Sequence, residues 1–208
     1  YRTKNNMFTG FDGILAELQK REAKKRMVAA WAVDDHTVSA ASLAVERGIA
    51  QVTLVGDKDL IVKVCDSEGI DITKFDIVDE PSELKAVSKA VDMVRNGEGD
   101  FLMKGLCSTD KFLRAVLNKE TGLLPPKGTL THCGVIEIPS YHKLLFVGDV
   151  AVIPAPDLKQ KQFIMECLVR TAKSVGVEMP KVALIAATEQ VLGSQPATME
   201  AALLAKMA

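Results

Sequence analysis

The chain has 208 residues, which is enough for one large α/β domain or for two small ones. Hydrophobic residues make up 48% and charged residues 25%, and the formal net charge is −1. With no basic stripe and no long run of like charges, this composition argues against a nucleic-acid or membrane partner. No apolar run reaches the roughly 20 residues that span a bilayer, and residues 1–6 lack the apolar core of a signal peptide. We therefore expect a cytoplasmic protein.

Strands and helices alternate along the first part of the chain. The apolar spacing predicts helices at 11–18, 37–47, 58–67, 81–94 and 110–117, with strands at 27–32, 51–55, 75–78 and 100–103. On the helix that Pro81 opens, four residues are expected to form one apolar stripe: Leu84, Val87, Val91 and Val94. The alternation is typical of a parallel sheet covered on both faces, whose ligands bind beyond the carboxyl ends of its strands.

The pattern changes after residue 118. Residues 121–128 are rich in glycine and proline and predict a loop or linker. The segments that follow are predicted as an antiparallel hairpin at 131–138 and 143–147, a long helix at 157–174, a strand at 181–186 and a helix at 196–207. We expect a first α/β domain at residues 1–124 and a second at residues 125–208.

The cysteines and the common motifs narrow the chemistry. The four cysteines lie beside apolar residues, form no CxxC pair and are expected as reduced thiols without a metal: Cys65, Cys107, Cys133 and Cys167. The sequence has no GxGxxG loop after a strand and no GxxxxGK[ST] loop, which argues against a Rossmann dehydrogenase and a P-loop nucleotidase. It has no GxSxG elbow and no HExxH motif either.

The segment with the clearest chemistry begins where the fourth predicted strand ends. Gly105 permits a tight turn, and Ser108 and Thr109 begin the next helix. A helix start presents unpaired N–H groups and the positive end of the helix dipole, and Lys104 and Arg114 add two cations. The segment therefore predicts a phosphate site. The alternative is ordinary capping, with either hydroxyl side chain as the N-cap.

Five further polar residues lie in or next to predicted strands, where ligand contacts are common: Asp35, His36, His132, Asp149 and Glu189. Asp35 and His36, with Asp34 before them, could contact a polar substrate or cofactor, or could belong to a solvated loop with an aspartate N-cap. His132 could orient an acyl phosphate, or could be a satisfied core or interface histidine. Asp149 and Glu189 are not specific by themselves.

Several short segments lie in a fixed order along the chain: Met103-Lys104-Gly105, Ser108-Thr109, Phe112-Leu113-Arg114-Ala115-Val116-Leu117, Thr131-His132, Gly134-Val135-Ile136-Glu137-Ile138-Pro139, Tyr141-His142-Lys143-Leu144-Leu145, Gly148-Asp149 and Pro196-Ala197-Thr198. Together they resemble the phosphate acetyltransferase/butyryltransferase family. The likeness runs from about residue 25 onward, and the segment at 141–145 is more similar to the butyryl branch than to the acetyl branch.

The resemblance implies the reversible transfer of an acyl group, with butyryl favoured, between coenzyme A and inorganic phosphate. It implies a fold similar to isocitrate and isopropylmalate dehydrogenases, with two α/β domains and a cleft between them. It further implies no metal, no tightly bound cofactor (coenzyme A being a substrate), only small-molecule partners (acyl-CoA, inorganic phosphate and acyl phosphate), and a homo-oligomer. The family chain continues well beyond residue 207, so the C-terminal part of the fold is expected to be missing. That part would carry the catalytic base and a serine–arginine pair at the phosphate.

The resemblance also assigns roles. Arg114 and, less directly, Lys104 would stabilise the oxyanion and the departing phosphate, and the turn at Gly105, Ser108 and Thr109 would bind phosphate. The five further polar residues are expected as contacts in the cleft. The coenzyme A thiolate would attack the acyl phosphate directly, without a covalent enzyme intermediate.

Two alternatives stay open. A phosphate acetyltransferase would differ only in the size of the acyl pocket, which discriminates by about 1–3 kcal/mol. A non-catalytic acyl-CoA- or phosphate-binding module is the other. A dehydrogenase of similar fold is less favoured, because neither a metal-binding carboxylate cluster nor a nucleotide loop is visible in the sequence.

Overall fold

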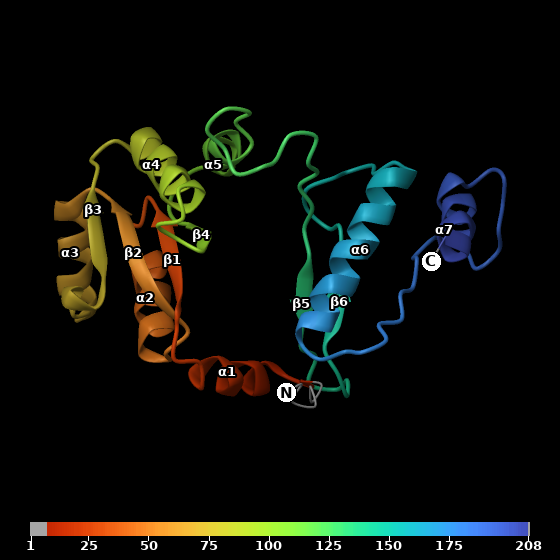
Figure 1. Cartoon of the computed structure of the whole chain (residues 1–208), viewed down its shortest axis with the longest axis horizontal. Coiled ribbons are helices and arrows are strands. Elements are labelled where there is room, and N and C mark those ends of the chain that lie inside the picture. Colours follow the sequence, from red (N-terminus) through yellow and green to blue (C-terminus); the bar gives the residue numbers. More distant parts are fainter. Residues whose placement is uncertain (1–7, 208) are drawn as a thin grey trace. The chain divides into compact units, whose positions relative to one another are not determined.

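A computed structural model describes residues 8–207. The chain divides into two compact units, which are described separately below (Figure 1). One unit is Leu15–Gly128, and the other combines the N-terminal residues up to Ile14 with the chain from Thr129 onward. Helix α1 (Phe11–Gln19) crosses the boundary between them. No helix among residues 8–207 has both the length and the apolar character needed to cross a bilayer.

The Leu15–Gly128 unit is built on a four-stranded parallel sheet. Its strands are β1 (Lys25–Ala30), β2 (Ala50–Gly56), β3 (Asp76–Asp79) and β4 (Phe101–Lys104), in the order β3-β2-β1-β4. The connecting helices are α2 (Asp35–Glu46), α3 (Lys58–Glu68), a short 3₁₀ turn (Ile72–Lys74) and α4 (Glu83–Arg95), and α5 (Thr109–Val116) follows β4. The predicted parallel sheet is therefore confirmed, and so are the helices predicted in this part of the chain.

Both faces of this sheet are covered, because alternate residues of β1 pack in opposite directions. Met27 and Ala29 belong to one buried cluster together with residues of α2 and α3. Val28 and Ala30 belong to a second buried cluster with residues of α4. A strand buried on both faces reads as a continuous apolar run, as Met27–Ala30 does.

The predicted stripe on α4 is wrong at one position. Leu84 is 59% exposed, whereas Ala86 and Ala90 are fully buried beside Val87 and Val91. The buried face therefore consists of two adjacent pairs four residues apart, Ala86 with Val87 and Ala90 with Val91. The small alanine side chains let α4 approach the sheet closely. Leu84 lies in the first turn of the helix, outside that face.

The second unit has an antiparallel hairpin and two helices. Strands β5 (Gly134–Ile136) and β6 (Leu145–Val147) pair as predicted, although both are shorter than expected, and His132 precedes β5 instead of lying in it. Helix α6 (Leu158–Ser174) begins with a capping box in which Asp157 and Gln160 bond each other's backbone N–H groups. Helix α7 (Pro196–Met207) has the predicted bounds.

The strand predicted at residues 181–186 is not present in this structure. The segment has no regular secondary structure, and within residues 8–207 no other strand pairs with it. A strand needs a hydrogen-bonded neighbour, and an apolar run by itself does not supply one.

Candidate phosphate site at the carboxyl end of the sheet

The strand order places a topological switch point between β1 and β4. From β1 the chain winds to β2 and β3 on one side, and then returns to add β4 on the other side of β1. In open α/β sheets, ligands bind beyond the carboxyl ends of the strands at such a point. The turn that follows β4, residues 104–109, and the turn that follows β1, residues 31–36, both begin there.

Backbone hydrogen bonds join these two turns. The Gly105 N–H donates to the Ala30 carbonyl at 2.9 Å, and the Leu106 N–H donates to the Trp31 carbonyl at 3.0 Å. The approach is close enough that a Cβ atom at Gly105 would lie 2.4 Å from the Trp31 oxygen and 2.7 Å from the Ala30 oxygen. Gly105 is therefore required for packing at this position, and this close approach sets where the β4 turn lies.

Trp31 is a residue that the sequence analysis missed. Its backbone has φ 55°, in the left-handed region that non-glycine residues rarely adopt. Its side chain is partly buried and packs against the buried cluster that includes Val28 and Cys107, as does Phe112 of α5. Unfavourable backbone conformations of this kind gather at functional sites. Their only trace in the sequence is an aromatic residue directly after a buried run.

The start of α5 is both capped and open to an anion. The Ser108 hydroxyl accepts a hydrogen bond from the Lys111 N–H at 3.2 Å, so Ser108 is the N-cap. The N–H groups of Thr109 and Asp110 bond no atom within residues 8–207. Capping and anion binding are thus compatible here, because the cap satisfies one donor and leaves two at the positive end of the helix dipole.

The two predicted cations, Arg114 and Lys104, lie close to this helix start in the chain, but each side chain already contacts an oxygen atom of the protein. Arg114 Nε lies 3.0 Å from an Asp110 carboxylate oxygen, and the two side chains are 80% and 69% exposed. Exposed pairs at i,i+4 are worth only a few tenths of a kcal/mol, about 0.3–0.5. Breaking this pair therefore costs little free energy, and Arg114 is able to turn from Asp110 to a bound phosphate. Lys104 is exposed, and its amine lies 3.4 Å from the Gly105 carbonyl.

The turn after β1 separates the roles of its polar residues. Asp34 is the N-cap of α2, with one carboxylate oxygen accepting from the Thr37 N–H at 3.1 Å. Its other oxygen is buried and bonds no described residue. The predicted contacts Asp35 and His36 are both exposed, and the Asp35 carboxylate accepts from the His36 N–H at 2.8 Å.

Cys107, in the β4 turn, is 4% exposed. Burial raises the pKa of its thiol, with a smaller opposing effect of the Lys104 charge. A buried thiol held in its protonated form is a poor nucleophile.

For the acyl transfer that the family resemblance implies, we therefore expect Cys107→Ser, made in the full-length protein, to keep most of the rate. Serine is nearly isosteric, and a direct attack by coenzyme A would need no thiolate of the enzyme. The readout is kcat with saturating substrates, alongside circular dichroism to show that the variant is folded. Complete loss of turnover in a folded variant would indicate a covalent route through Cys107.

The remaining predicted residues lie in the second unit, where Asp149 organises a turn after β6. Its carboxylate accepts from the Thr131 hydroxyl at 2.8 Å and from the N–H groups of His132, Ala151 and Val152 at 3.1, 2.9 and 2.8 Å. Burial alone would raise the pKa of Asp149, but these hydrogen bonds together hold it well below its usual range. Asp149 therefore ties the segment before β5 to the end of β6, and its carboxylate is already fully used.

Within residues 8–207, no hydrogen bond or ion pair joins His132 to Glu189. The Nδ1 atom of His132 is buried and has no hydrogen-bond partner within residues 8–207. Glu189 is exposed, in the loop between residue 186 and α7. No group of three or more His, Cys, Asp or Glu side chains in the described part of the chain is arranged to hold a metal ion.

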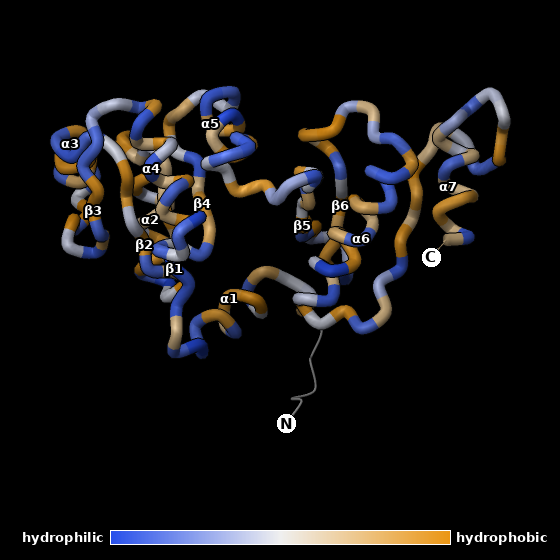
Figure 2. Tube along the Cα trace, turned by 45° about the horizontal axis from the view of Figure 1, so that its top comes forward, coloured by the Kyte–Doolittle hydropathy of each residue, from blue (hydrophilic) through white to orange (hydrophobic). Residues whose placement is uncertain are grey.

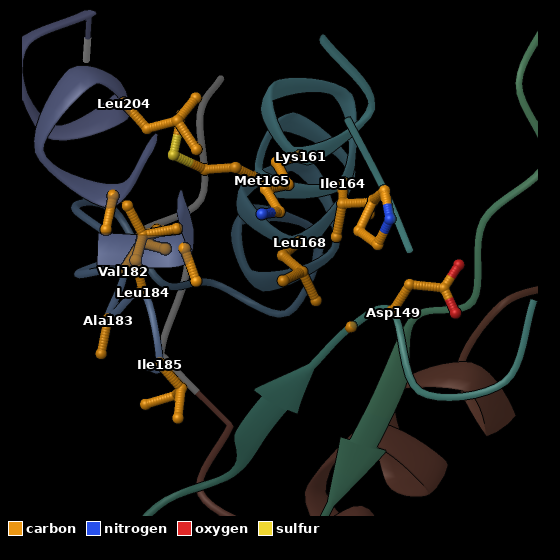
Figure 3. A pocket seen from close by; sticks show the side chains of 14 residues that line it. Asp149, Lys161, Ile164, Met165, Leu168, Val182, Ala183, Leu184, Ile185 and Leu204 are labelled. Atoms are coloured by element: carbon orange, nitrogen blue, oxygen red, sulfur yellow. The ribbon is translucent and has the colours of Figure 1, made fainter. Parts of the chain in front are cut away.

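A cavity of about 220 Å³ in the second unit is mainly apolar. Side chains of α6, of residues 182–185 and of α7 line it, and Figure 3 shows Met165 and Leu204 pointing toward one another across it. Asp149 lies at its edge with its carboxylate turned away (Figure 3), and Lys161 is paired with Glu200. These charged groups are thus not free for a ligand in the cavity.

Asp149→Asn is expected to lower the free energy of unfolding at neutral pH and to make that free energy depend less on pH in the acid range. Because the pKa of Asp149 is depressed on folding, its contribution is present above the unfolded-state pKa of about 3.9 and is lost as the pH falls below that value. Urea unfolding of the full-length protein at several pH values between 7 and 2.5 measures this. Glu189→Gln, at an exposed carboxylate, is the control and should unfold like wild type. Equal pH slopes for wild type and Asp149→Asn would contradict the assignment.

Comparisons with known proteins agree with this architecture. A family model described as "Phosphate acetyl/butaryl transferase" matches residues 80–208. The chain is 43% identical over 201 residues to a phosphate butyryltransferase of Clostridium acetobutylicum, covering 97% of this chain and 66% of that protein. It is 36% identical over 193 residues to a phosphate acetyltransferase of Thermotoga maritima, covering 93% and 65%. The chain therefore spans about two thirds of the length of these relatives.

Solved structures give the same fold. A branched-chain phosphotransacylase from Enterococcus faecalis V583 superposes with a TM-score of 0.74 at 22% identity, covering 88% of this chain and 63% of that one. The EutD phosphotransacetylase from Staphylococcus aureus superposes with a TM-score of 0.72 at 17% identity, covering 94% and 68%.

Proposed function

Because the chain belongs to the phosphate acetyl/butyryl transferase family, we propose that the protein transfers a short-chain acyl group between coenzyme A and inorganic phosphate. The observation that carries this proposal is the candidate anion site at the switch point between β1 and β4. That site offers two N–H donors at a helix start and Arg114, whose only ion pair is an exposed one with Asp110. N–H donors and a guanidinium group are the partners that bind a phosphoryl group.

Butyryl is the favoured acyl group. The chain is 43% and 39% identical to two clostridial phosphate butyryltransferases, compared with 36% to the acetyltransferase of Thermotoga maritima. The margin is small, so the two acyl groups must be compared directly on the enzyme.

The proposed reaction is a direct displacement. The sulfur of the coenzyme A thiolate forms a bond to the acyl-phosphate carbonyl carbon, and the carbon–oxygen bond to phosphate then breaks. The electron pair leaves with the phosphate, and the thiol proton goes to a base. Developing negative charge on the carbonyl oxygen and on the phosphate is stabilised by the Thr109 and Asp110 N–H groups, by Arg114 and by Lys104. Gly105 and Ser108 shape the turn, and Asp35 and His36, which follow β1, are proposed as further polar contacts to the substrate.

We do not assign the base to Asp34, Asp35 or Cys107. Asp34 caps α2, Asp35 is held by its own loop, and Cys107 is a buried thiol. Since the chain spans about two thirds of its curated relatives, we assign the base to the part of the family's length outside these 208 residues.

Phosphate-dependent release of coenzyme A tests the proposal. Full-length protein is mixed with butyryl-CoA or acetyl-CoA and inorganic phosphate. Free thiol is followed with a disulfide reagent, and the acyl phosphate is trapped as a hydroxamate. We expect both products in equal amounts, with kcat/KM about 10-fold or more higher for butyryl-CoA, the discrimination that two methylenes can supply. Thiol release that does not depend on phosphate, or no release at all, would contradict the proposed reaction. Faster turnover of acetyl-CoA would assign the protein to the acetyl branch.

A further inference from the structure

Helix α5, which begins at the candidate phosphate site, has few buried contacts to hold it in the Leu15–Gly128 unit. It has eight residues, all of them described by the structure, and none is buried. Figure 2 shows its hydrophilic start beside α4, and the two helices contact each other. On its apolar side, Phe112 and Ala115 pack against the cluster that includes Val87 of α4. Because so few buried groups fix α5, its first turn depends on further contacts to keep one position.

An ion pair between α4 and α5 supplies such a contact. Lys111 Nζ lies 2.6 Å from Glu83 Oε2, and the two side chains are 41% and 27% exposed. Glu83 is the first residue of α4, and Lys111 lies in the first turn of α5. The Arg114–Asp110 pair lies within α5 and cannot fix that helix relative to a neighbour. The Glu83–Lys111 pair joins two helices, so it can.

The sign of the Lys111 charge supports this role. The helix dipole favours an anion in the first turn of a helix and disfavours a cation there. Glu83 is therefore favourable at the start of α4, whereas Lys111 is unfavourable at the start of α5 unless an anion offsets its charge. The backbone N–H of Lys111 also donates to the Ser108 hydroxyl at 3.2 Å. One residue thus joins the cap of α5 to the start of α4.

We propose that Glu83 is a positioning residue of the phosphate site. Through Lys111 it holds the first turn of α5, and with it the N–H groups of Thr109 and Asp110, in the place where an anion binds them. Donors of this kind act well only when they are held to within about 0.5 Å of the productive geometry. The inference rests on the proposed function, because it concerns the same site.

Glu83→Gln in the full-length protein tests the inference, since it removes the charge of the pair and keeps the shape of the side chain. We expect KM for phosphate, and the phosphate Kd from equilibrium dialysis, to rise at least about fivefold, while kcat stays within about twofold of wild type. The reason for this split is that phosphate must now order the first turn as it binds, whereas the loaded site is unchanged.

Charge alone predicts the opposite direction. Removing a carboxylate close to an anion site strengthens anion binding when the carboxylate acts only through its charge. An unchanged KM for Glu83→Gln would overturn the inference. A lower KM would overturn it as well, because Lys111, once released, would then bind the phosphate directly.

A second ion pair in the same unit gives the matched control for stability. Lys74 Nζ lies 2.7 Å from Glu46 Oε1, between the 3₁₀ turn and the last residue of α2. Glu46→Gln should lower Tm about as much as Glu83→Gln, by less than about 4 °C in each case, and should leave KM for phosphate unchanged. An equal rise of KM in Glu46→Gln would overturn the inference, because the effect would then be one of stability.

Exchanging the two charges gives the rescue. The double variant Glu83→Lys with Lys111→Glu rebuilds the pair in reverse, and KM for phosphate should return to within about twofold of wild type. No recovery would overturn the inference. If wild type binds no phosphate in dialysis, the proposed function fails and this inference fails with it. If wild type binds phosphate and Glu83→Gln binds it equally well, only this inference fails.

Discussion

Replacing Arg114 by alanine in the full-length protein should lower kcat/KM for phosphate by about 10²–10³-fold, with losses in both KM and kcat. The reason is that Arg114 lies on α5 only five and four residues after Thr109 and Asp110, whose N–H groups are unbonded within residues 8–207. It is held only by an exposed pair with Asp110. Charge that develops in the transition state would lose its strongest partner. Initial rates across a range of phosphate concentrations measure the effect.

Two control variants make this test specific. Arg95 is an exposed arginine in the last turn of α4, shortly before β4 begins, and so belongs to the amino end of the strands. Arg95→Ala should leave the phosphate kinetics unchanged. Asp110→Asn frees Arg114 from its pair and should leave KM for phosphate unchanged or lower it about twofold. Wild-type kinetics for Arg114→Ala, or an equal loss in Arg95→Ala, would remove Arg114 from the site.

Gly105→Ala should destabilise the protein by about 3 kcal/mol and abolish phosphate binding. An added Cβ would meet two carbonyl oxygens of β1 and its turn at 2.4 and 2.7 Å, so the backbone must move. That movement breaks the hydrogen bonds from Gly105 and Leu106 that hold the β4 turn against the end of β1. Urea unfolding reports the stability, and equilibrium dialysis with labelled phosphate reports the binding.

The matched control is Gly193→Ala. A Cβ at Gly193 would meet nothing within 4 Å, so the substitution should change stability by less than about 0.5 kcal/mol. If Gly105→Ala behaved like Gly193→Ala, the close approach of the two turns would not be required in solution.

The sequence predicted the elements of the first unit well because their signals are local. The continuous apolar run of β1 and the helix stops at Gly48 and Gly69, with φ of 64° and 65°, can be read without the fold. Strand order cannot be read in this way, because it depends on which long-range contacts offset the entropy cost of closing each loop. The switch point between β1 and β4 therefore came only from the structure.

For the candidate site, the sequence located the turn but not its detailed arrangement. Ser108 and Thr109 follow a strand and precede an amphipathic helix, and that order predicts both the cap and the donors. Trp31 and the buried oxygen of Asp34 depend on how two distant turns meet, which no spacing encodes. The pairing of Arg114 with Asp110 could have been foreseen from their i,i+4 spacing.

The second unit was harder to predict for a different reason. Asp149 was singled out because it follows a strand, and it does, but its position leads to four hydrogen bonds within its own turn. The apolar run at 181–186 carries the local signal of a strand, yet pairing needs two segments, and no strand within the described residues pairs with it.

The most direct test of the central claim is a crystal structure of the full-length protein soaked with inorganic phosphate. We expect phosphate density within hydrogen-bond reach of the Thr109 and Asp110 N–H groups, with Arg114 turned from Asp110 toward it. Phosphate bound elsewhere, with the start of α5 empty and Arg114 still paired to Asp110, would contradict the account.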